Sequence, residues 1–199
     1  MLTAWMLCTL IPESSATGND MNTAVTMGLA ATGRMPDLKT SPLVIFTVGT
    51  AASGKSTWAR SMQSRYTGLR IAIIERDGIR VSLHEGKSEG VFSWPAWNPA
   101  LEGKVQRLWE QQVRGAIGTH DVLVLADTHL DVADLAKKAQ WLRDQGVTEM
   151  SVHYFPALPL MELIRRDRGR GHPVGGEVLR EHIKKLEPED RYWEVVEGL

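Results

Sequence analysis

The stretch GTAASGKS, residues 49–56, constrains the fold of this chain more than any other feature. It matches the pattern G-x-x-x-x-G-K-[ST], in which a glycine-rich loop follows a strand and opens a helix. The apolar run LVIFTV at 43–48 precedes the loop, and residues 55–66 follow it with a helical pattern. The sequence therefore predicts a strand, a loop and a helix in succession, which is a building unit of parallel α/β sheets.

From residue 43 onward, short apolar runs alternate with helical segments. This alternation is typical of an α/β protein whose parallel sheet is covered by helices on both faces. Further strands are predicted at 70–75, 121–127 and 149–155. Further helices are predicted at about 99–118 and 131–145, with Gly146 as a helix stop. The segment 158–188 predicts two more helices around a glycine-rich basic turn.

Residues 1–41 differ in composition from the rest of the chain, because Thr, Ser, Ala, Gly and Met dominate and no helical or strand period persists. We expect a poorly ordered extension here, followed by one domain at 42–199. Met21, Met27 and Met35 lie within the extension, so we hypothesise that translation starts physiologically at one of them. The intact mass of the natively expressed protein tests this hypothesis, and a full-length product would contradict it.

The charge balance limits the classes of partner. The chain has 23 Lys and Arg against 24 Asp and Glu, a formal net charge of -1. A uniformly basic surface is therefore excluded, and any contact with nucleic acid must come from local clusters. No apolar run approaches the roughly 18 residues needed to cross a membrane. The single cysteine, Cys8, excludes an internal disulfide, so we expect a cytoplasmic protein without a membrane partner.

The glycine-rich loop predicts a binding site for the phosphates of a nucleotide. Its glycines let the backbone curl, so that main-chain N–H groups and the helix N-terminus face an anion. Lys55 is expected to reach the β- and γ-phosphates, and Ser56 to hold Mg²⁺. We therefore predict ATP and Mg²⁺ as cofactors. The candidate nucleotide-binding residues in the loop are Gly49, Thr50, Ala51, Ala52, Ser53, Gly54, Lys55, Ser56 and Thr57.

Molecular switches, motors and ATPases share such a loop, so the loop alone does not identify a kinase. Evidence for a site that binds a phosphate acceptor must come from other residues. In IIERDGIRVSL, the residues Asp77 and Arg80 follow a predicted strand and are three apart, which places them on one face of the next helix. A carboxylate there can accept the proton of a hydroxyl group, and a guanidinium can hold a phosphate or position the acceptor. The alternative is an acidic residue at a helix N-terminus that pairs with a surface arginine.

Asp127 ends the predicted strand DVLVLAD, at the carboxyl edge where parallel sheets present their ligands. An acid at this position can act on Mg²⁺ through water or orient an arginine. The alternative is an aspartate that caps the following turn. His129, two residues further on, is interpreted as structural.

A cluster of arginines lies in LIRRDRGRGHP, at positions 165, 166, 168 and 170. The neighbouring glycines permit motion, so the cluster suits a lid that closes over a transferring phosphate, with Arg166 and Arg170 as the candidate phosphate ligands. A solvated basic helix end is the alternative.

Four motifs together, GTAASGKSTWAR, ERDGIR, LADTHL and RRDRGRG, resemble in order and spacing the kinase domain of the T-even phage polynucleotide kinase family. The resemblance covers about residues 43–186. It implies a P-loop kinase-like parallel sheet with helices on both faces and a C-terminal helical arginine lid. The loop of that family differs from this one at Ala52, where the family has glycine.

The resemblance also implies roles for individual residues. Lys55 and Ser56 would bind phosphates and metal, and Asp77 would be the general base. The remaining catalytic candidates are Arg80 as the contact to the acceptor, Asp127 as the acid that organises the acceptor-side arginine, and Arg170 as the lid arginine on the donor phosphates. Arg166 matches a further lid arginine.

Two departures from that family bear on the acceptor. The bifunctional members continue into a phosphatase domain with an Asp-x-Asp motif, whereas this sequence does not. The segment FSWPAWNP, residues 92–99, is an insertion that the end-healing enzymes do not share. Trp94 and Trp97 could stack on a base near the acceptor pocket. Alternatively they cap the core beside Trp109.

Two nucleic-acid acceptors fit this resemblance: the 5′-hydroxyl of a strand end and a hydroxymethyl group on a modified base within DNA. Similar phage kinases phosphorylate 5-hydroxymethyluracil in DNA during thymidine hypermodification. We favour that acceptor, because of the missing phosphatase half, the near-neutral charge and the tryptophan insertion. A phage-encoded protein would act in the host cytoplasm. A small-molecule or nucleoside kinase, and a non-catalytic module that binds nucleoside triphosphates, stay open as alternatives.

Overall fold

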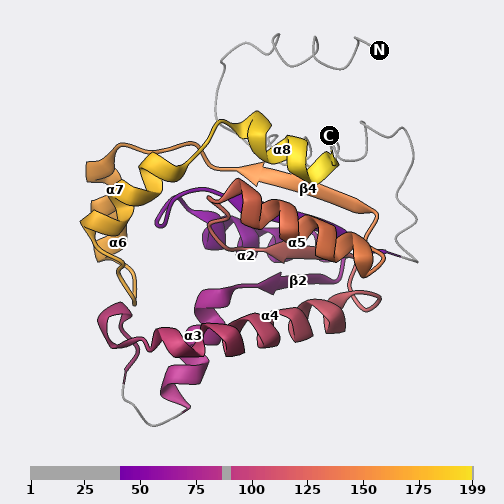
Figure 1. Ribbon diagram of the computed structural model, residues 1–199, viewed down its shortest axis with the longest axis horizontal. Coiled ribbons are helices and arrows are strands. Elements are labelled where there is room, and N and C mark those ends of the chain that lie inside the picture. The colour runs from indigo at the N-terminus through magenta and orange to yellow at the C-terminus, as the bar shows by residue number, and fades with distance from the viewer. Residues whose placement is uncertain (1–40, 87–90, 199) are drawn as a thin grey trace. The chain divides into compact units, whose positions relative to one another are not determined.

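The computed structural model describes residues 41–86 and 91–198 (Figure 1). The predictions made for Cys8, for the three methionines and for nearly all of the extension at 1–41 concern residues outside these ranges. Ser41, the first described residue, is buried, and its Oγ accepts a hydrogen bond from the backbone N of Thr148 at 3.2 Å.

Four parallel strands form one sheet in the order β2-β3-β1-β4. The strands are β1 (Leu43–Val48), β2 (Ile71–Ile74), β3 (Val122–Leu125) and β4 (Glu149–Tyr154). In the register, Leu43 of β1 lies opposite Val122 of β3 and Glu149 of β4. The predicted strands are confirmed, with ends that differ by one or two residues. Their apolar character follows from burial, because a parallel sheet is covered on both faces.

Helices connect the strands and follow the last of them. They are α2 (Lys55–Arg65), α3 (Arg76–Glu85), α4 (Glu102–Ala116), α5 (Val132–Asp144), α6 (Leu160–Arg168), α7 (Gly176–Lys185) and α8 (Glu189–Glu197). Two single turns of 3₁₀ helix, η1 (Trp94–Ala96) and η2 (Pro99–Leu101), precede α4. Gly146, with φ of +87°, follows the end of α5 as predicted. The helix α8 was not predicted.

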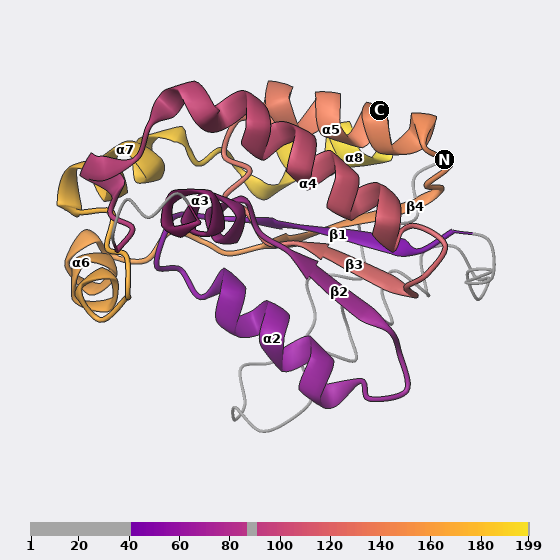
Figure 2. The ribbon, with the colours of Figure 1, turned by 90° about the horizontal axis from the view of Figure 1, so that it is seen from below.

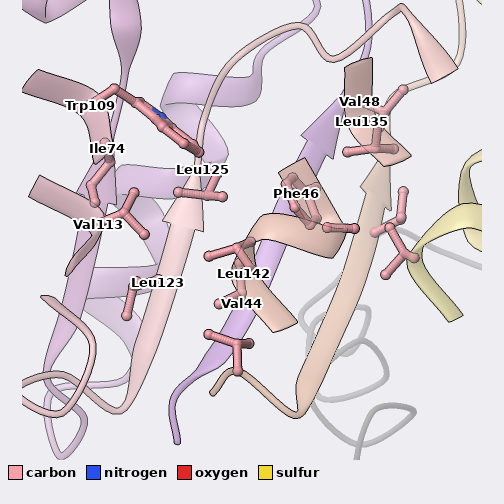
Figure 3. Close-up of a cluster of buried hydrophobic side chains, with 14 of the residues drawn as sticks. Val44, Phe46, Val48, Ile74, Trp109, Val113, Leu123, Leu125, Leu135 and Leu142 are labelled. Atoms are coloured by element: carbon pink, nitrogen blue, oxygen red, sulfur yellow. The ribbon is translucent and has the colours of Figure 1, made fainter. Parts of the chain in front are cut away.

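The helices cover both faces of the sheet, which confirms the predicted α/β class. Figure 2 shows α2 against one face, and α4, α5 and α8 against the other. The main core lies between the sheet and the second group of helices (Figure 3). There, strand residues Val44, Phe46, Leu123 and Leu125 meet helix residues Trp109, Val113, Leu135 and Leu142, all nearly inaccessible to solvent. Each such side chain contributes about 1.5–3 kcal/mol through burial.

The topology places a crevice at the carboxyl ends of β1 and β3. These strands are neighbours, yet the chain leaves β1 through α2 on one face and β3 through α5 on the other. Ligands of open α/β sheets bind at such a switch point, outside the carboxyl ends of the strands. In Figure 1, α6 and α7 lie beyond the same ends of the strands.

Candidate active site

A cleft of about 990 Å³ opens at this edge of the sheet. Its volume is at the upper end of the range typical of ligand sites, about 300–1,000 Å³. Most of the residues singled out in the sequence line it: Ala51, Ala52, Gly54, Lys55, Ser56, Thr57, Asp77, Arg80, Asp127, Arg166 and Arg170. Gly49, Thr50 and Ser53 belong to the same loop without lining the cleft. Four separate motifs therefore meet at one place.

The glycine-rich loop depends on Gly49 for its start. The N–H of Gly49 donates to the backbone O of Thr128 at 3.0 Å, which ties the loop to the end of β3. Gly49 has φ of +156°, and a Cβ there would lie 2.7 Å from the Cβ of Phe155. Gly54, with φ of +110°, precedes α2 and has no such neighbour within 4 Å. Ala52, at φ of +61°, adopts the left-handed conformation that favours glycine.

Gly49→Ala is expected to destabilise the domain. The added methyl group meets the Phe155 Cβ, a backbone-proximal atom that cannot move aside, so we expect a loss of about 2–4 kcal/mol. For a domain of this size the melting temperature should fall by roughly 5–15 °C in calorimetry. Gly68→Ala is the matched control, because its Cβ would have no neighbour within 4 Å. Equal melting temperatures of the two variants would contradict this account of the loop.

The ammonium group of Lys55 lies inside the loop. Its Nζ donates to the backbone O of Gly49 at 3.0 Å and to the backbone O of Thr50, and the side chain is buried. Burial and the nearby Arg170 lower the pKa of Lys55 to about 8. A charge kept in a desolvated loop interacts strongly with an anion bound there.

The lowered pKa of Lys55 predicts how ATP binding depends on pH. Below a pH of about 8 the free protein carries this charge, and above it the charge is lost. Because bound phosphates stabilise the charged amine, ATP binding takes up a proton above this pH. The dissociation constant should therefore rise by up to about tenfold per pH unit. Calorimetric titrations from about pH 7 to 9.5 measure this. Lys55→Arg keeps its charge throughout, so a similar rise in that variant would contradict the assignment.

Asp127 is fixed at the carboxyl end of β3 by main-chain contacts. The hydroxyl of Thr47 donates to its backbone O at 2.9 Å, and its Oδ1 accepts from the backbone N of Arg76 at 2.8 Å. Burial raises the pKa of the Asp127 carboxyl. Its arginine partner is Arg76, whose Nε lies 3.8 Å from Oδ2, rather than the acceptor-side Arg80 that the resemblance implied. The reason is position: Arg76 opens α3 directly beside β3, whereas Arg80 lies one turn further along α3.

His129 is a buried residue with contacts to β1. Its side chain is buried, its Nδ1 lies 2.9 Å from the backbone O of Thr47, and its ring meets Phe46 edge to face. Burial lowers the pKa of this imidazole well below its usual value. The residue therefore joins the turn after β3 to the end of β1.

Asp77 and Arg80 form an ion pair on one face of α3, as their spacing predicted. Arg80 Nη1 donates to Asp77 Oδ1 at 2.8 Å. The Asp77 side chain is about half exposed (49%), whereas Arg80 is mostly covered (16%). Arg80 also donates from Nε and Nη2 to the two carboxylate oxygens of Glu102, at 2.9 Å each. Glu102 opens α4 and was not singled out in the sequence.

The arginine-rich segment reaches the cleft from α6 and the turn after it. Arg166 Nε donates to Glu162 at 2.6 Å, and Arg170 Nη1 donates to Asp167 at 3.3 Å. Asp167 is almost fully buried and also accepts from the backbone N of Val174 and of Gly175. This acid therefore shapes the glycine-rich turn that carries Arg170, a role that its place among arginines did not reveal.

A histidine from α7 contacts the glycine-rich loop directly. Ala51 N donates to the Nδ1 of His182 at 3.2 Å. Burial, with Lys55 nearby, lowers the pKa of this imidazole, which suits a ring nitrogen that accepts a hydrogen bond. The loop and the C-terminal helices are thus joined within the cleft.

The two tryptophans of the insertion do not line the cleft. Trp97 packs against the main core, and its Nε1 donates to Glu102 Oε1 at 2.7 Å. Trp94 has the guanidinium of Arg80 over its ring at 5.8 Å. The structure thus shows Trp97 covering the core, in line with the second of the two interpretations, and it does not show an open platform for a base.

Oxygen ligands suited to Mg²⁺ are present in the cleft. Ser56 lines it from the first turn of α2, and Asp127 Oδ2, which also lies there, is buried without a hydrogen-bond partner among the described residues. Hydroxyl and carboxylate oxygens are the ligands that Mg²⁺ prefers. Within 41–86 and 91–198 there is no cluster of three or more His, Cys, Asp or Glu side chains that could hold a metal by themselves.

In the same ranges no helix has the length and apolar character of a membrane span.

A parallel sheet whose first strand leads through a glycine-rich, lysine-bearing loop into a helix defines the P-loop class of nucleotide-binding domains. A family model described as an AAA domain matches residues 44–188, and the chain belongs to that family. No curated protein matches the chain.

Solved structures also match. One is the structure of the Pnkp1/Rnl/Hen1 complex, with 22% identity and a TM-score of 0.49 over 66% of this chain and 42% of that chain. This chain thus spans less than half the length of that protein. Another comes from the PezAT chromosomal toxin-antitoxin system of Streptococcus pneumoniae, with 15% identity and a TM-score of 0.42 over 94% and 96%. At these values neither likeness indicates what this chain acts on.

Proposed function

We propose that this protein is an ATP-dependent kinase that transfers the γ-phosphate to a hydroxyl group on DNA. The favoured acceptor is the 5-hydroxymethyl group of 5-hydroxymethyl-deoxyuridine in phage DNA. The observation that carries the proposal is that the ion pair of Asp77 and Arg80 lines the same cleft as Lys55. A half-exposed carboxylate in the same cleft as the nucleotide-binding loop supports transfer to an acceptor, because it can take up the proton of a hydroxyl group.

In this proposal Asp77 accepts the proton of the acceptor hydroxyl as its oxygen attacks the γ-phosphorus. The bond between that phosphorus and the β,γ-bridging oxygen breaks, and ADP leaves. Lys55 and Arg170 neutralise the charge on the transferring group, and Arg166 supports them. When bound by Ser56, with Asp127 acting through water, Mg²⁺ supplies further charge neutralisation at the phosphates.

Support for a DNA acceptor comes from the charge of the cleft and from the resemblance to phage polynucleotide kinases. Basic side chains outnumber acidic ones along the cleft, although the chain as a whole has a net charge of -1. Lys184 and Lys185 of α7 and Arg191 of α8 extend the basic lining beyond the loop. Such a local cluster is what contact with a phosphate backbone requires.

Labelled ATP and three DNAs test the proposal. One DNA has 5′-hydroxyl ends, one contains 5-hydroxymethyluracil with blocked ends, and one is ordinary DNA with blocked ends. After nuclease digestion to nucleotides without a phosphatase, we expect the label on the hydroxymethyl group of the hydroxymethyl-deoxyuridine nucleotide alone. Label at strand ends would identify a 5′-hydroxyl kinase, and label on a free nucleoside added to the reaction would identify a nucleoside kinase. ATP binding without transfer to any of these hydroxyls would show a non-catalytic module and overturn the proposal.

A further inference from the structure

The aromatic insertion at 92–99 is anchored at its start by Phe92. Phe92 is nearly fully buried, and its ring lies 5.3 Å from that of Trp94 and 6.0 Å from that of Trp97. It also meets the ring of His84, in α3, edge to face, and His172 Nδ1 lies 3.1 Å from its backbone O. The insertion therefore contacts α3 on one side and, on the other, the glycine-rich turn that follows α6.

This anchored segment forms a hydrogen bond with Glu102. The indole N–H of Trp97 donates to Glu102 Oε1 at 2.7 Å, and the same oxygen accepts from Arg80 Nε at 2.9 Å. Hydrogen bonds from Arg80, followed by its charge and by the hydrogen bond of Trp97, lower the pKa of Glu102, so the carboxylate stays ionised. A side-on, two-bond contact fixes the plane of a guanidinium as well as its position.

Two carboxylates thus share one guanidinium. Glu102 accepts hydrogen bonds from Nε and Nη2 of Arg80, and Asp77 accepts one from Nη1. The face of Arg80 lies over Trp94, so the guanidinium is held on three sides. The other titratable groups around Asp77 are Lys55 inside the loop, Asp127 after β3 and His182 of α7.

We propose that Glu102 is a positioning residue: it holds Arg80 so that the guanidinium makes a single contact with Asp77 and leaves that carboxylate available to take a proton. This inference rests on the proposed kinase function. Without Glu102, Arg80 is free to turn and to form a two-bond pair with Asp77, and paired carboxylates are weaker bases. The insertion, through Trp97 and Trp94, then helps to hold Glu102 and Arg80 in place on the acceptor side of the cleft.

Glu102→Gln tests the proposal, because it keeps the shape of the side chain and removes the charge. We expect kcat to fall by about tenfold or more, and the KM for ATP to change by less than about twofold. Trp97→Phe, which removes the indole N–H that donates to Glu102 together with one ring of the side chain, should lower kcat by less.

Glu110→Gln is the matched control. Glu110 lies on the same helix, contacts Gln106 and Arg114, and does not line the cleft. We expect its kcat and its KM for ATP to equal those of the unaltered protein. A Glu102→Gln variant with unchanged kcat overturns the proposal, and so does a loss of kcat with a comparable rise in the KM for ATP, which would indicate a merely structural role.

A second measurement separates this inference from the proposed function. The Nε–H of Arg80 gives a ¹⁵N NMR signal whose exchange with water is slowed by the contact to Glu102, and the variant should exchange about tenfold faster or more. Unchanged exchange overturns the inference even if the kinase activity is found. Faster exchange in a protein that phosphorylates no hydroxyl leaves the contact with Arg80 established, and overturns both the proposed function and the role of Glu102 in it.

Discussion

Lys55→Met is expected to lower the turnover of phosphate transfer by about 10³-fold or more. Methionine fills a similar volume and suits a side chain that is 7% exposed, although it cannot donate to the backbone O of Gly49 and of Thr50. It cannot carry the positive charge that neutralises the transferring phosphoryl group in a desolvated cleft, where such a charge acts most strongly. Steady-state rates with labelled ATP and the best acceptor measure the effect.

A matched control for this variant is Lys104→Met, because Lys104 is an exposed residue of α4 outside the cleft. Its rate should equal that of the unaltered protein. Melting temperatures of both variants show whether each is folded. A folded Lys55→Met protein that retains more than about a tenth of the original turnover would rule out the assigned role.

Asp77→Asn is expected to lower kcat by about 10²–10⁴-fold, the contribution typical of a general base. The amide oxygen can still accept from Arg80 Nη1, so the geometry of the ion pair is largely kept while the proton acceptor is lost. Because Asp77 serves the acceptor side, the dissociation constant of ATP should change by less than about twofold. Single-turnover rates and calorimetric titrations measure the two quantities separately.

Asp144→Asn, at the exposed end of α5, is the control for loss of a carboxylate far from the cleft. It should leave both quantities unchanged. If Asp77→Asn or Asp77→Ala turned over at a near-normal rate, the assignment of Asp77 as the base would have to be abandoned.

Local patterns predicted the fold well, because they depend on contiguous residues. The strands at 43–48 and 149–154 appear with nearly the expected ends, and the break after α5 falls at Gly146. The helix α8 was missed because its main signal is not local: Tyr192 and Val196 are buried only once α8 packs on α5 and β4. Its nine residues are too few for a periodic pattern to stand out.

The tryptophan insertion shows the limit of reasoning from composition. Two tryptophans near a predicted acceptor site left two interpretations open: a platform for a base, which is a common use of such side chains, and a cover of the core beside Trp109. The structure turns Trp97 toward the core and Glu102. Which side of an indole faces water depends on neighbours distant in sequence, here Phe92, α3 and the turn of His172.

The sequence by itself determined the strand, the glycine-rich loop and the helix, and with them the place of Lys55, because backbone conformation and N–H direction depend on adjacent residues. It also placed Asp77 and Arg80 on one helical face. Only the tertiary structure decided which partners these groups have. Glu102 is 22 positions from Arg80, Asp127 is 51 from Arg76, and His182 is 131 from Ala51. Contacts at such separations arise only when the sheet and its helices bring distant segments together, and no local pattern records them.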